Sequence, residues 1–337
     1  MFRYERWPFY DKEVYMEYGE QPERLEIQIG SGLSSLINKK NGEPLLNELE
    51  YLRNYFDAEL GLPVPKIPVK ENKFLEKNEY ILLFNGVQAG RGLINPESNS
   101  GDTPEQIIRE HLVKVIRKNI TSMLDHYQVN KLVCKVRTVN PDIVDHLFFL
   151  KNDKFSTTTL KALLNLLLSE EVSIRDMNTI LETVADYGSV SYEPVQVVDK
   201  VRQRLALGIL SKYADKNNII HGIVVPEEVS LIIQESLYFS PDQSEKPKCA
   251  LERTYRHKLT KKILSLSNFM KEKGFPTVFL CTSVIRQGFA EFLGDVLNST
   301  DEDFCCVSDV EILAVDGQIT FQKEGELTLE DNSNEDS

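Results

Sequence analysis

The apolar residues of this chain recur at helical spacing in several long stretches. The clearest case is residues 169–188, where one face of an amphipathic helix is apolar. Its apolar residues are Ile174, Met177, Ile180, Leu181 and Val184. Ser173 is the expected N-cap, and Gly188 is expected to end the helix in a left-handed turn. The pattern alone predicts a core helix of a helical subdomain.

The N-terminal part alternates between the two periodicities. Apolar and polar residues alternate over Leu25–Ile29, which predicts a half-buried strand. A helical stripe over Leu45–Phe56 predicts a helix that Gly61 ends. Asn85-Gly86 between two β-prone runs predicts a hairpin with a type I′ turn. Thr103, followed by proline and by Gln106, predicts the start of another helix.

The C-terminal third predicts alternating strands and helices. The expected strands are Ile219–Val225, Thr277–Thr282 and Phe304–Val307, and the expected helices open at Pro226, span Ala250–Lys273 before Gly274, and span Ser283–Leu297. Such alternation favours a small parallel sheet. The middle of the chain is helical, and an extended link at Val190–Tyr192 suits a winged-helix-like module.

These patterns together predict an α+β chain of several subdomains. A linker-like segment, 1–24, precedes a first, ferredoxin- or RRM-like α/β subdomain at 25–126. A helical, winged-helix-like subdomain follows at 127–211, then a C-terminal α/β subdomain with a small parallel sheet at 212–325. The acidic tail, 326–337, is expected to be disordered, since from Glu324 on it has no cationic residue.

Composition narrows the function. The 337 residues carry a formal net charge of −13, which disfavours nonspecific nucleic-acid binding. No secretory signal is visible, and the longest apolar run, Leu160–Leu168, is about half the length that a bilayer needs. Five cysteines without a CxxC pair indicate reduced thiols and a cytoplasmic protein. We therefore expect no membrane insertion, with recruitment to the inner face of a membrane only through partners.

No residue pattern points to catalysis. Gly30-Ser31-Gly32 lacks the third glycine of a dinucleotide fingerprint, and the five histidines have no metal-ligand spacing. Cys305-Cys306 lies in an expected buried strand, and Glu170-Glu171 is interpreted as a solvated helix approach rather than an acid/base pair. We expect no enzyme, cofactor or metal. A basic helix face at Arg253–Lys262 is either solvated or a dock for an acidic partner or a neighbour's acidic tail.

Several segments resemble motifs of a known family, both in their amino-acid sequences and in their order along the chain. They are Leu25–Leu33 (LEIQIGSGL), Asn78–Gly92, Glu110-His111-Leu112, Glu171–Gly188 (EVSIRDMNTILETVADYG) and Val201–Leu205 (VRQRL). They resemble, in this order, motifs of the cytosolic part of the flagellar and type III secretion export-gate family (the FlhA/SctV, or FHIPEP, family). The resemblance runs from about Leu25 to Phe321.

The resemblance implies fold, partners and contact residues. It implies export-apparatus proteins or substrate–chaperone complexes as partners, and a homo-oligomeric, nine-membered ring. The candidate partner or subunit contacts that it gives are Trp7, Asp11, Glu110, Arg175, Asp176 and Arg202. The family has a second subdomain where this chain has only Leu93–Asp102, so chaperone docking by the family's route is in doubt.

The expected function is therefore a non-enzymatic docking and assembly module related to the export gate. The family's members normally carry a membrane-spanning half, so this chain is either part of a longer protein or a free-standing relative, and its irregular start favours the second. The alternative is a divergent scaffold or regulator that kept the fold and lost chaperone–substrate docking. The flagellar and virulence branches are not distinguished.

Overall fold

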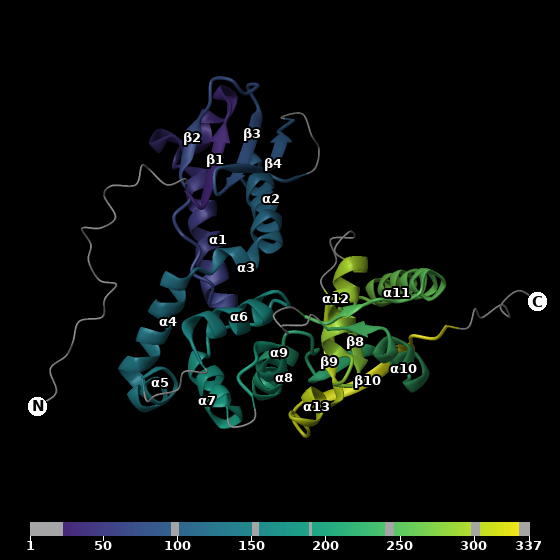
Figure 1. Ribbon diagram of the computed structural model, residues 1–337. Helices are drawn as coiled ribbons and strands as arrows, with labels where there is room; N and C mark the ends of the chain where they lie inside the picture. The colour runs from purple at the N-terminus through teal and green to yellow at the C-terminus, as the bar shows by residue number, and fades with distance from the viewer. Residues whose placement is uncertain are drawn as a thin grey trace, which may run out of the picture. The chain divides into compact units, whose positions relative to one another are not determined.

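The computed structural model describes residues 23–95, 101–149, 155–188, 191–239, 246–297 and 304–329. They form two compact units. Unit 1 contains the residues up to Asp57 and Pro63–Asn119, and unit 2 contains Ala58–Leu62 and the residues from Ile120 on. Helix α1 (Pro44–Leu60) contributes residues to both units (Figure 1). In the described ranges, no helix combines the length and the apolar character needed to cross a bilayer.

Unit 1 is a four-stranded sheet with helices. Its strands are β1 (Leu25–Ile29), β2 (Val69–Glu71), β3 (Glu79–Phe84) and β4 (Val87–Leu93), and its other elements are two short 3-10 helices (Ser31–Ile37 and Lys39–Asn41), α1 and α2 (Pro104–Lys118). The order is β2-β1-β3-β4, with β2 parallel to β1 and the other pairs antiparallel. The predicted strand and hairpin are confirmed: Asn85 and Gly86 both have positive φ, as a type I′ turn requires.

The ferredoxin-like description of this subdomain is wrong. That fold alternates as βαββαβ, whereas here β1, α1 and β2 form a direct parallel crossover and three consecutive strands precede α2. The first unit also ends at Asn119 rather than at residue 126. Of the expected loop Leu93–Asp102, Leu93 closes β4 and Ile94 is buried, while residues 96–100 lie outside the described residues.

Two glycines of β4 let α2 approach the sheet. The Tyr80 hydroxyl and Nδ1 of His111 are 2.9 Å apart, which ties β3 to α2. A Cβ on Gly92 would lie 2.5 Å from the Tyr80 ring, and one on Gly90 would lie 2.7 Å from the His111 ring. Because real Cβ atoms do not approach so closely, the absence of side chains at these positions is what permits the contact.

Unit 2 begins with a helical region. Its helices are α3 (Ile120–Met123), α4 (His126–Val139), α5 (Pro141–Phe148), α6 (Thr157–Leu168), α7 (Met177–Tyr187), α8 (Pro194–Arg204) and α9 (Ala206–Leu210). Leucines on α6 and the predicted apolar face of α7 are buried, as expected. No strand occurs in the described part of this region, so a winged-helix-like module is not supported; Val190 lies outside the described residues.

The ends of α7 differ from the prediction. The N-cap is Asp176, whose carboxylate accepts a hydrogen bond from the Thr179 amide at 3.0 Å, rather than Ser173. Gly188 is right-handed, with φ of −61°, so it does not end the helix by a left-handed turn. A Cβ there would lie 2.2 Å from the Tyr192 ring. The glycine therefore makes room for an aromatic ring.

Unit 2 ends with an α/β region. Its elements are β5 (Ile219–Val224), α10 (Glu227–Glu235), β6 (Leu237–Tyr238), β7 (Lys248–Cys249), α11 (Arg253–Glu272), β8 (Thr277–Cys281), α12 (Arg286–Leu297), β9 (Phe304–Ser308), α13 (Asp309–Leu313) and β10 (Thr320–Glu326). The main sheet has the order β10-β5-β8-β9 and is parallel throughout. The predicted parallel sheet and its three strands are confirmed, and Gly274 ends α11 with φ of +76°.

Strand β10 was not predicted. Its sequence is polar, yet it pairs with β5 along its whole length. Glu324 accepts a hydrogen bond from Lys273 at 2.7 Å and pairs with His221 at 2.8 Å. Glu326, the last residue of β10, was assigned to the disordered tail. Leu327, which the sequence analysis also assigned to the disordered tail at 326–337, is fully buried in the core of the α/β region. The rest of the expected tail, residues 330–337, lies outside the described residues.

Candidate functional site

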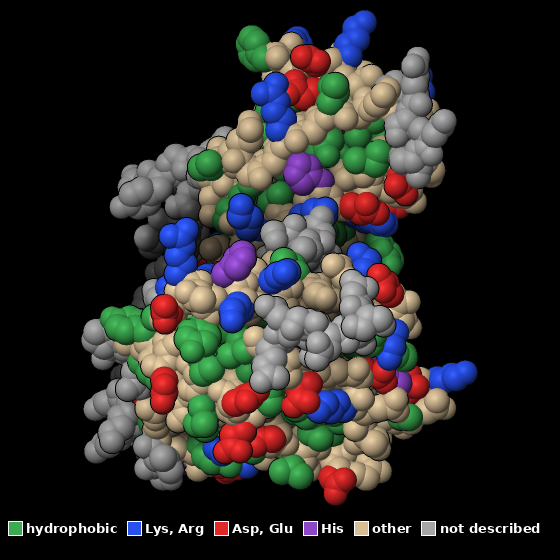
Figure 2. Space-filling model, turned by 90° about the vertical axis from the view of Figure 1, so that its right-hand side faces the viewer, with side chains coloured by type: hydrophobic (Ala, Val, Ile, Leu, Met, Phe, Trp, Pro, Cys, Tyr) green, Lys and Arg blue, Asp and Glu red, His purple; other side chains and the backbone are tan. Residues whose placement is uncertain are grey.

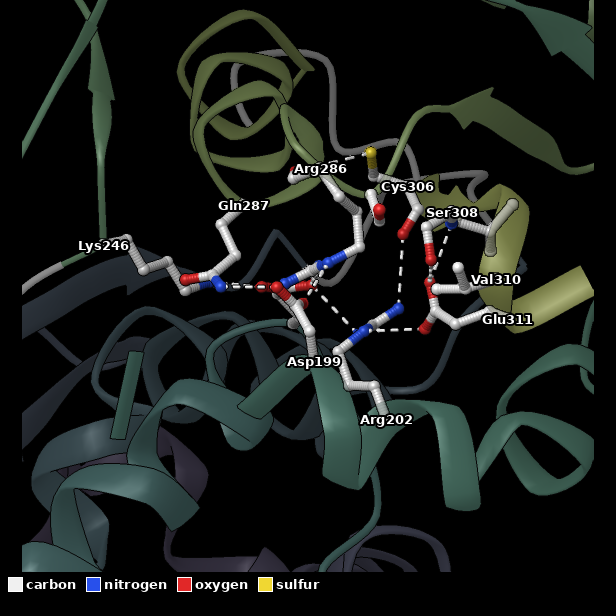
Figure 3. Close-up of polar contacts among 12 residues, drawn as sticks. Asp199, Arg202, Lys246, Arg286, Gln287, Cys306, Ser308, Val310 and Glu311 are labelled. Carbon is white, nitrogen blue, oxygen red and sulfur yellow. Dashed lines mark hydrogen bonds and ion pairs between the residues drawn. The ribbon is translucent and has the colours of Figure 1, made fainter. Parts of the chain in front are cut away.

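Charged side chains converge in the interior of unit 2, where the helical region meets the α/β region (Figure 3). We call this group the buried charge network. It consists of Glu170, Asp199, Arg202, Lys246, Arg286 and Glu311. The side chains come from the turn after α6, from α8, from the segment before β7, from α12 and from α13. Segments far apart in sequence are therefore joined by charge rather than by apolar contact alone.

Glu170 is the hub of the network. One carboxylate oxygen accepts a hydrogen bond from Lys246 Nζ at 2.7 Å. The other accepts from Arg202 Nη1 at 2.9 Å and from Arg286 Nη1 at 2.6 Å. Its interpretation as a solvated helix approach is wrong, because the side chain is only 12% exposed. A single carboxylate thus holds three cations.

Arg202 connects α8 to the end of β9 and to α13. Its Nε donates to Glu311 Oε1 at 2.8 Å, and its Nη2 donates to the carbonyl of Cys306 at 3.2 Å. The second oxygen of Glu311 accepts hydrogen bonds from the Ser308 amide and hydroxyl at 2.7 and 2.8 Å. This capping box at the start of α13 fixes the carboxylate, which in turn fixes the guanidinium.

Arg286 is the first residue of α12 and points back to α8. Its Nε donates to Asp199 Oδ1 at 2.7 Å, and Gln287 donates to Asp199 Oδ2 at 2.6 Å and to the Val195 carbonyl at 2.8 Å. Pro194 occupies the first position of α8, where its missing amide costs no hydrogen bond. The start of α8 is thereby tied to the start of α12.

The network balances three cations against three carboxylates. Burial alone would raise the pKa of Glu170, but Arg286, Lys246 and Arg202 more than offset this and hold the pKa well below its usual range. Burial alone would lower the pKa of Arg202, yet the neighbouring Glu311 and Glu170 raise it. Glu170, Arg202 and Arg286 are therefore charged at neutral pH, and each depends on oppositely charged neighbours for compensation.

The thiols beside the network are chemically quiet. Sγ of Cys281 and Sγ of Cys306 lie 3.7 Å apart. Burial raises the pKa of Cys305 to about 12. Burial and the neighbouring Cys281 thiol raise the pKa of Cys306 well above its usual value. Since the thiolate is the reactive form, these thiols serve as core residues. Among the residues whose placement is described, no cluster of three or more His, Cys, Asp or Glu could hold a metal ion.

The residues assigned by resemblance fall in different parts of the chain. Trp7 and Asp11 lie outside the described residues. Glu110 is exposed on α2, with Arg109 Nη2 at 3.5 Å. Asp176 caps α7, and Arg175, beside it, donates a hydrogen bond to the carbonyl of Ala58 at 2.6 Å.

Arg202, also assigned to a partner contact, is only 2% exposed and belongs to the network. As placed here, its guanidinium contacts this chain alone. The expected partner contact is corrected to an internal one, because every nitrogen of the group has an acceptor within unit 2. The exposed candidates for a partner are thus Glu110, Arg175 and Asp176.

The family model described as "FHIPEP family" matches residues 11–100 and 98–312. The chain belongs to the FHIPEP family. Relatives include the flagellar biosynthesis protein FlhA of Treponema pallidum (strain Nichols), 26% identical over 306 residues, and FlhA of Borreliella burgdorferi, 25% identical over 304 residues. In both cases the alignment covers 78% of this chain and 42% of the relative, so the chain spans less than half of their length.

Solved structures share the fold of this FHIPEP chain. The Chlamydia pneumoniae CdsV protein in its complex with CdsO has a TM-score of 0.77 at 19% identity, covering 93% of this chain and 99% of that one. The Shigella flexneri MxiA protein has a TM-score of 0.71 at 17% identity, covering 91% and 99%. At this identity the likeness establishes the fold, which agrees with the mixed α/β class that the sequence predicted.

Proposed function

We propose that this chain is a docking and assembly module of a flagellar or type III secretion export apparatus, and that it acts by binding rather than by catalysis. The observation that carries the proposal is membership of the FHIPEP family, whose curated relatives are flagellar biosynthesis proteins. The buried charge network supports it, because its ion pairs join α8, α12 and α13 within unit 2. Its surfaces are then presented in a fixed arrangement.

We also propose that the module forms a ring and binds another apparatus protein. Among its structural neighbours are a nonameric EPEC SctV-C and a nonameric EscV cytosolic domain, and the CdsV neighbour was solved with CdsO. The proposed contacts are the exposed Glu110, Arg175 and Asp176, with Trp7 and Asp11 in the N-terminal segment. Recruitment to a membrane would then come through partners.

Light scattering after size-exclusion chromatography tests the ring. The expected result is a species of defined size that grows at the expense of the monomer as concentration rises. Asp176→Asn should weaken it, because asparagine keeps the N-cap acceptor for Thr179 while removing the charge. Asp142→Asn, in the exposed first turn of α5, is the matched control. A strictly monomeric protein at high concentration would end the ring proposal.

A second candidate is a scaffold or regulator that kept the fold and lost chaperone–substrate docking. It is favoured by the family match, which falls into two segments that meet at residues 98–100, where the resemblance implies a missing subdomain. Binding assays with purified export chaperones, with and without cargo, and with purified apparatus proteins separate the two. Binding of apparatus proteins favours the first candidate, and no binding of either class favours the second.

A further inference from the structure

The first half of α11 is strongly basic in an acidic chain. Residues 253–262 read RTYRHKLTKK, with five lysines or arginines, one histidine and no acid, while the whole chain has a net charge of −13. The first turn of the helix has no acidic residue, and the N-cap Glu252 makes no capping hydrogen bond. The helix dipole adds partial positive charge at this same end. The local potential is therefore positive, and Glu252 at the N-cap is the one adjacent acid in the sequence.

Most of these cations have no ion-pair partner. Among the described residues, Arg256 alone of the five is paired, with Asp295 at 3.1 Å, and it also lies over the Phe292 ring. Arg253, Lys258 and Lys261 are exposed. Arg253, Arg256, His257 and Thr260 line a surface hollow of about 500 Å³. In Figure 2, basic side chains gather at the level of α11, and acidic ones are more frequent below.

The outer face of α11 favours a peptide over a bilayer as its occupant. The apolar face of the helix, which contains Leu259, Ile263 and Met270, packs into the core of the α/β region. Tyr255 is the one large exposed apolar side chain on the described helix, too little to insert into lipid. An anionic surface as large as a membrane or a nucleic acid would also meet the repulsion of the acidic remainder of the chain. A short acidic segment can contact the basic face without approaching the acidic remainder of the chain.

Such a segment follows directly after β10. A Cβ built on Gly325 would lie 3.4 Å from Cδ2 of Leu266, so the end of β10 runs beside α11. Leu327 and Leu329 pack on the same core as the buried face of the helix. The eight residues that follow, 330–337, contain Glu330, Asp331, Glu335 and Asp336 and no cation.

The distances allow these residues to reach the basic face of their own chain. Lys262 and Lys258 lie about 6 and 12 Å from Leu266 along the helix axis, at about 1.5 Å per residue. Eight extended residues span up to about 27 Å. A tethered segment also acts at a high effective concentration, which lets weak surface ion pairs add up to measurable occupancy.

We propose that residues 330–337 dock on the basic first half of α11 of the same chain and occupy the face made by Arg253, Lys258, Lys261 and Lys262. An acidic segment of another protein that binds this face must first displace the tail. The tail thus sets a threshold for acidic partners at α11. This inference does not depend on the proposed ring or on its contacts.

The rate of lysine acylation tests the proposal. The full chain and a variant with Glu330→Gln, Asp331→Asn, Glu335→Gln and Asp336→Asn are treated with acetic anhydride and analysed by peptide mass spectrometry. Lys258, Lys261 and Lys262 should react about threefold more slowly in the unaltered chain, corresponding to about two-thirds occupancy. The difference should vanish in 1 M salt, where the Debye length is about 3 Å. Exposed Lys212 and Lys216 in the same unit serve as internal controls.

The outcomes separate the occupants. Equal rates in the two proteins at low salt would overturn the proposal. Protection that appears only as protein concentration rises would assign the face to the tail of a second copy and overturn docking within one chain. Protection that is independent of concentration supports it. Because the substituted residues follow the described fold, unfolding monitored by circular dichroism should be the same for both proteins.

Discussion

The two four-stranded sheets in the described part of the chain are secured by different means. In unit 1 the cation of each described ion pair is open to solvent: Lys70 and Arg91 are each 59% exposed, and Arg109 is 25% exposed. In unit 2 the cations of the network are closed to solvent: Arg202 is 2% exposed, Arg286 1% and Lys246 10%. Close packing at glycines occurs in both units, whereas the buried charge network belongs to unit 2.

The comparison shows that removing one partner of an ion pair should cost different amounts of stability in the two units. A pair near solvent loses little when one partner is removed, because water replaces the lost contact. A pair in the interior leaves an uncompensated charge behind. The predictions below compare the two regions directly.

Glu170→Gln should have the largest effect. The change leaves Lys246, Arg202 and Arg286 facing only two carboxylates in a closed site, so unit 2 should lose about 3–5 kcal/mol of unfolding free energy. Urea unfolding followed by circular dichroism measures the loss, and hydrogen exchange at α8 and α12 locates it.

Glu48→Gln in unit 1 is the matched control for Glu170→Gln. It removes the partner of Arg109 at 2.7 Å, with the same change of side chain, and should cost no more than about 1 kcal/mol. Comparable losses from the two substitutions would contradict the distinction between rim and interior.

Gly92→Ala tests whether steric fit limits unit 1. The new Cβ would lie 2.5 Å from the buried Tyr80 ring, and the forced shift should cost about 1–3 kcal/mol. Gly208→Ala on α9 meets nothing within 4 Å and should be neutral or slightly stabilising. Thermal unfolding of both variants checks the pair, and an unchanged melting temperature for Gly92→Ala would count against the close fit.

The smallest effect concerns acid sensitivity at β10. Hydrogen bonds from Lys273 and then from His221 lower the pKa of Glu324 from 4.5 to about 2. A carboxylate with a lowered pKa stabilises the fold above its unfolded pKa, so this contribution should fade as pH falls from about 4.5 to about 2. Glu324→Gln should therefore differ from the unaltered chain near neutral pH and converge with it in acid. A difference that stays constant over this range would refute the assignment.

Local chemistry made much of the fold predictable. The alternation of apolar and polar residues identified β1, and the Asn85-Gly86 pair identified the hairpin. Gly61 and Gly274 follow helices with positive φ, as expected. These signals act within a few residues, so an isolated sequence contains them. The family could be predicted for the same reason, since its motifs are short and keep their order.

The buried charge network could not be predicted in this way. Glu170 and Arg286 lie 116 positions apart, and Glu170-Glu171 by itself resembles any solvated pair of acids. Strand β10 was missed because a polar sequence such as TFQKEGE gains its strand character from pairing with β5. Arg202 was assigned to a partner contact because its own carboxylate partners, Glu170 and Glu311, lie far away in the sequence. Only an alignment of relatives could reveal such paired charges in advance.

Helix α1 has a consequence for the order of synthesis. Its last turn belongs to unit 2, where the Leu60 carbonyl accepts from the Ile174 amide and the Ala58 carbonyl accepts from Arg175, 117 positions later. During synthesis on the ribosome, these two carbonyls have no hydrogen-bond donor from Ile174 or Arg175 until more than a hundred further residues have been added. A fragment that starts at residue 120 would lack Ala58–Leu62 altogether, so unit 2 cannot be excised as one continuous piece.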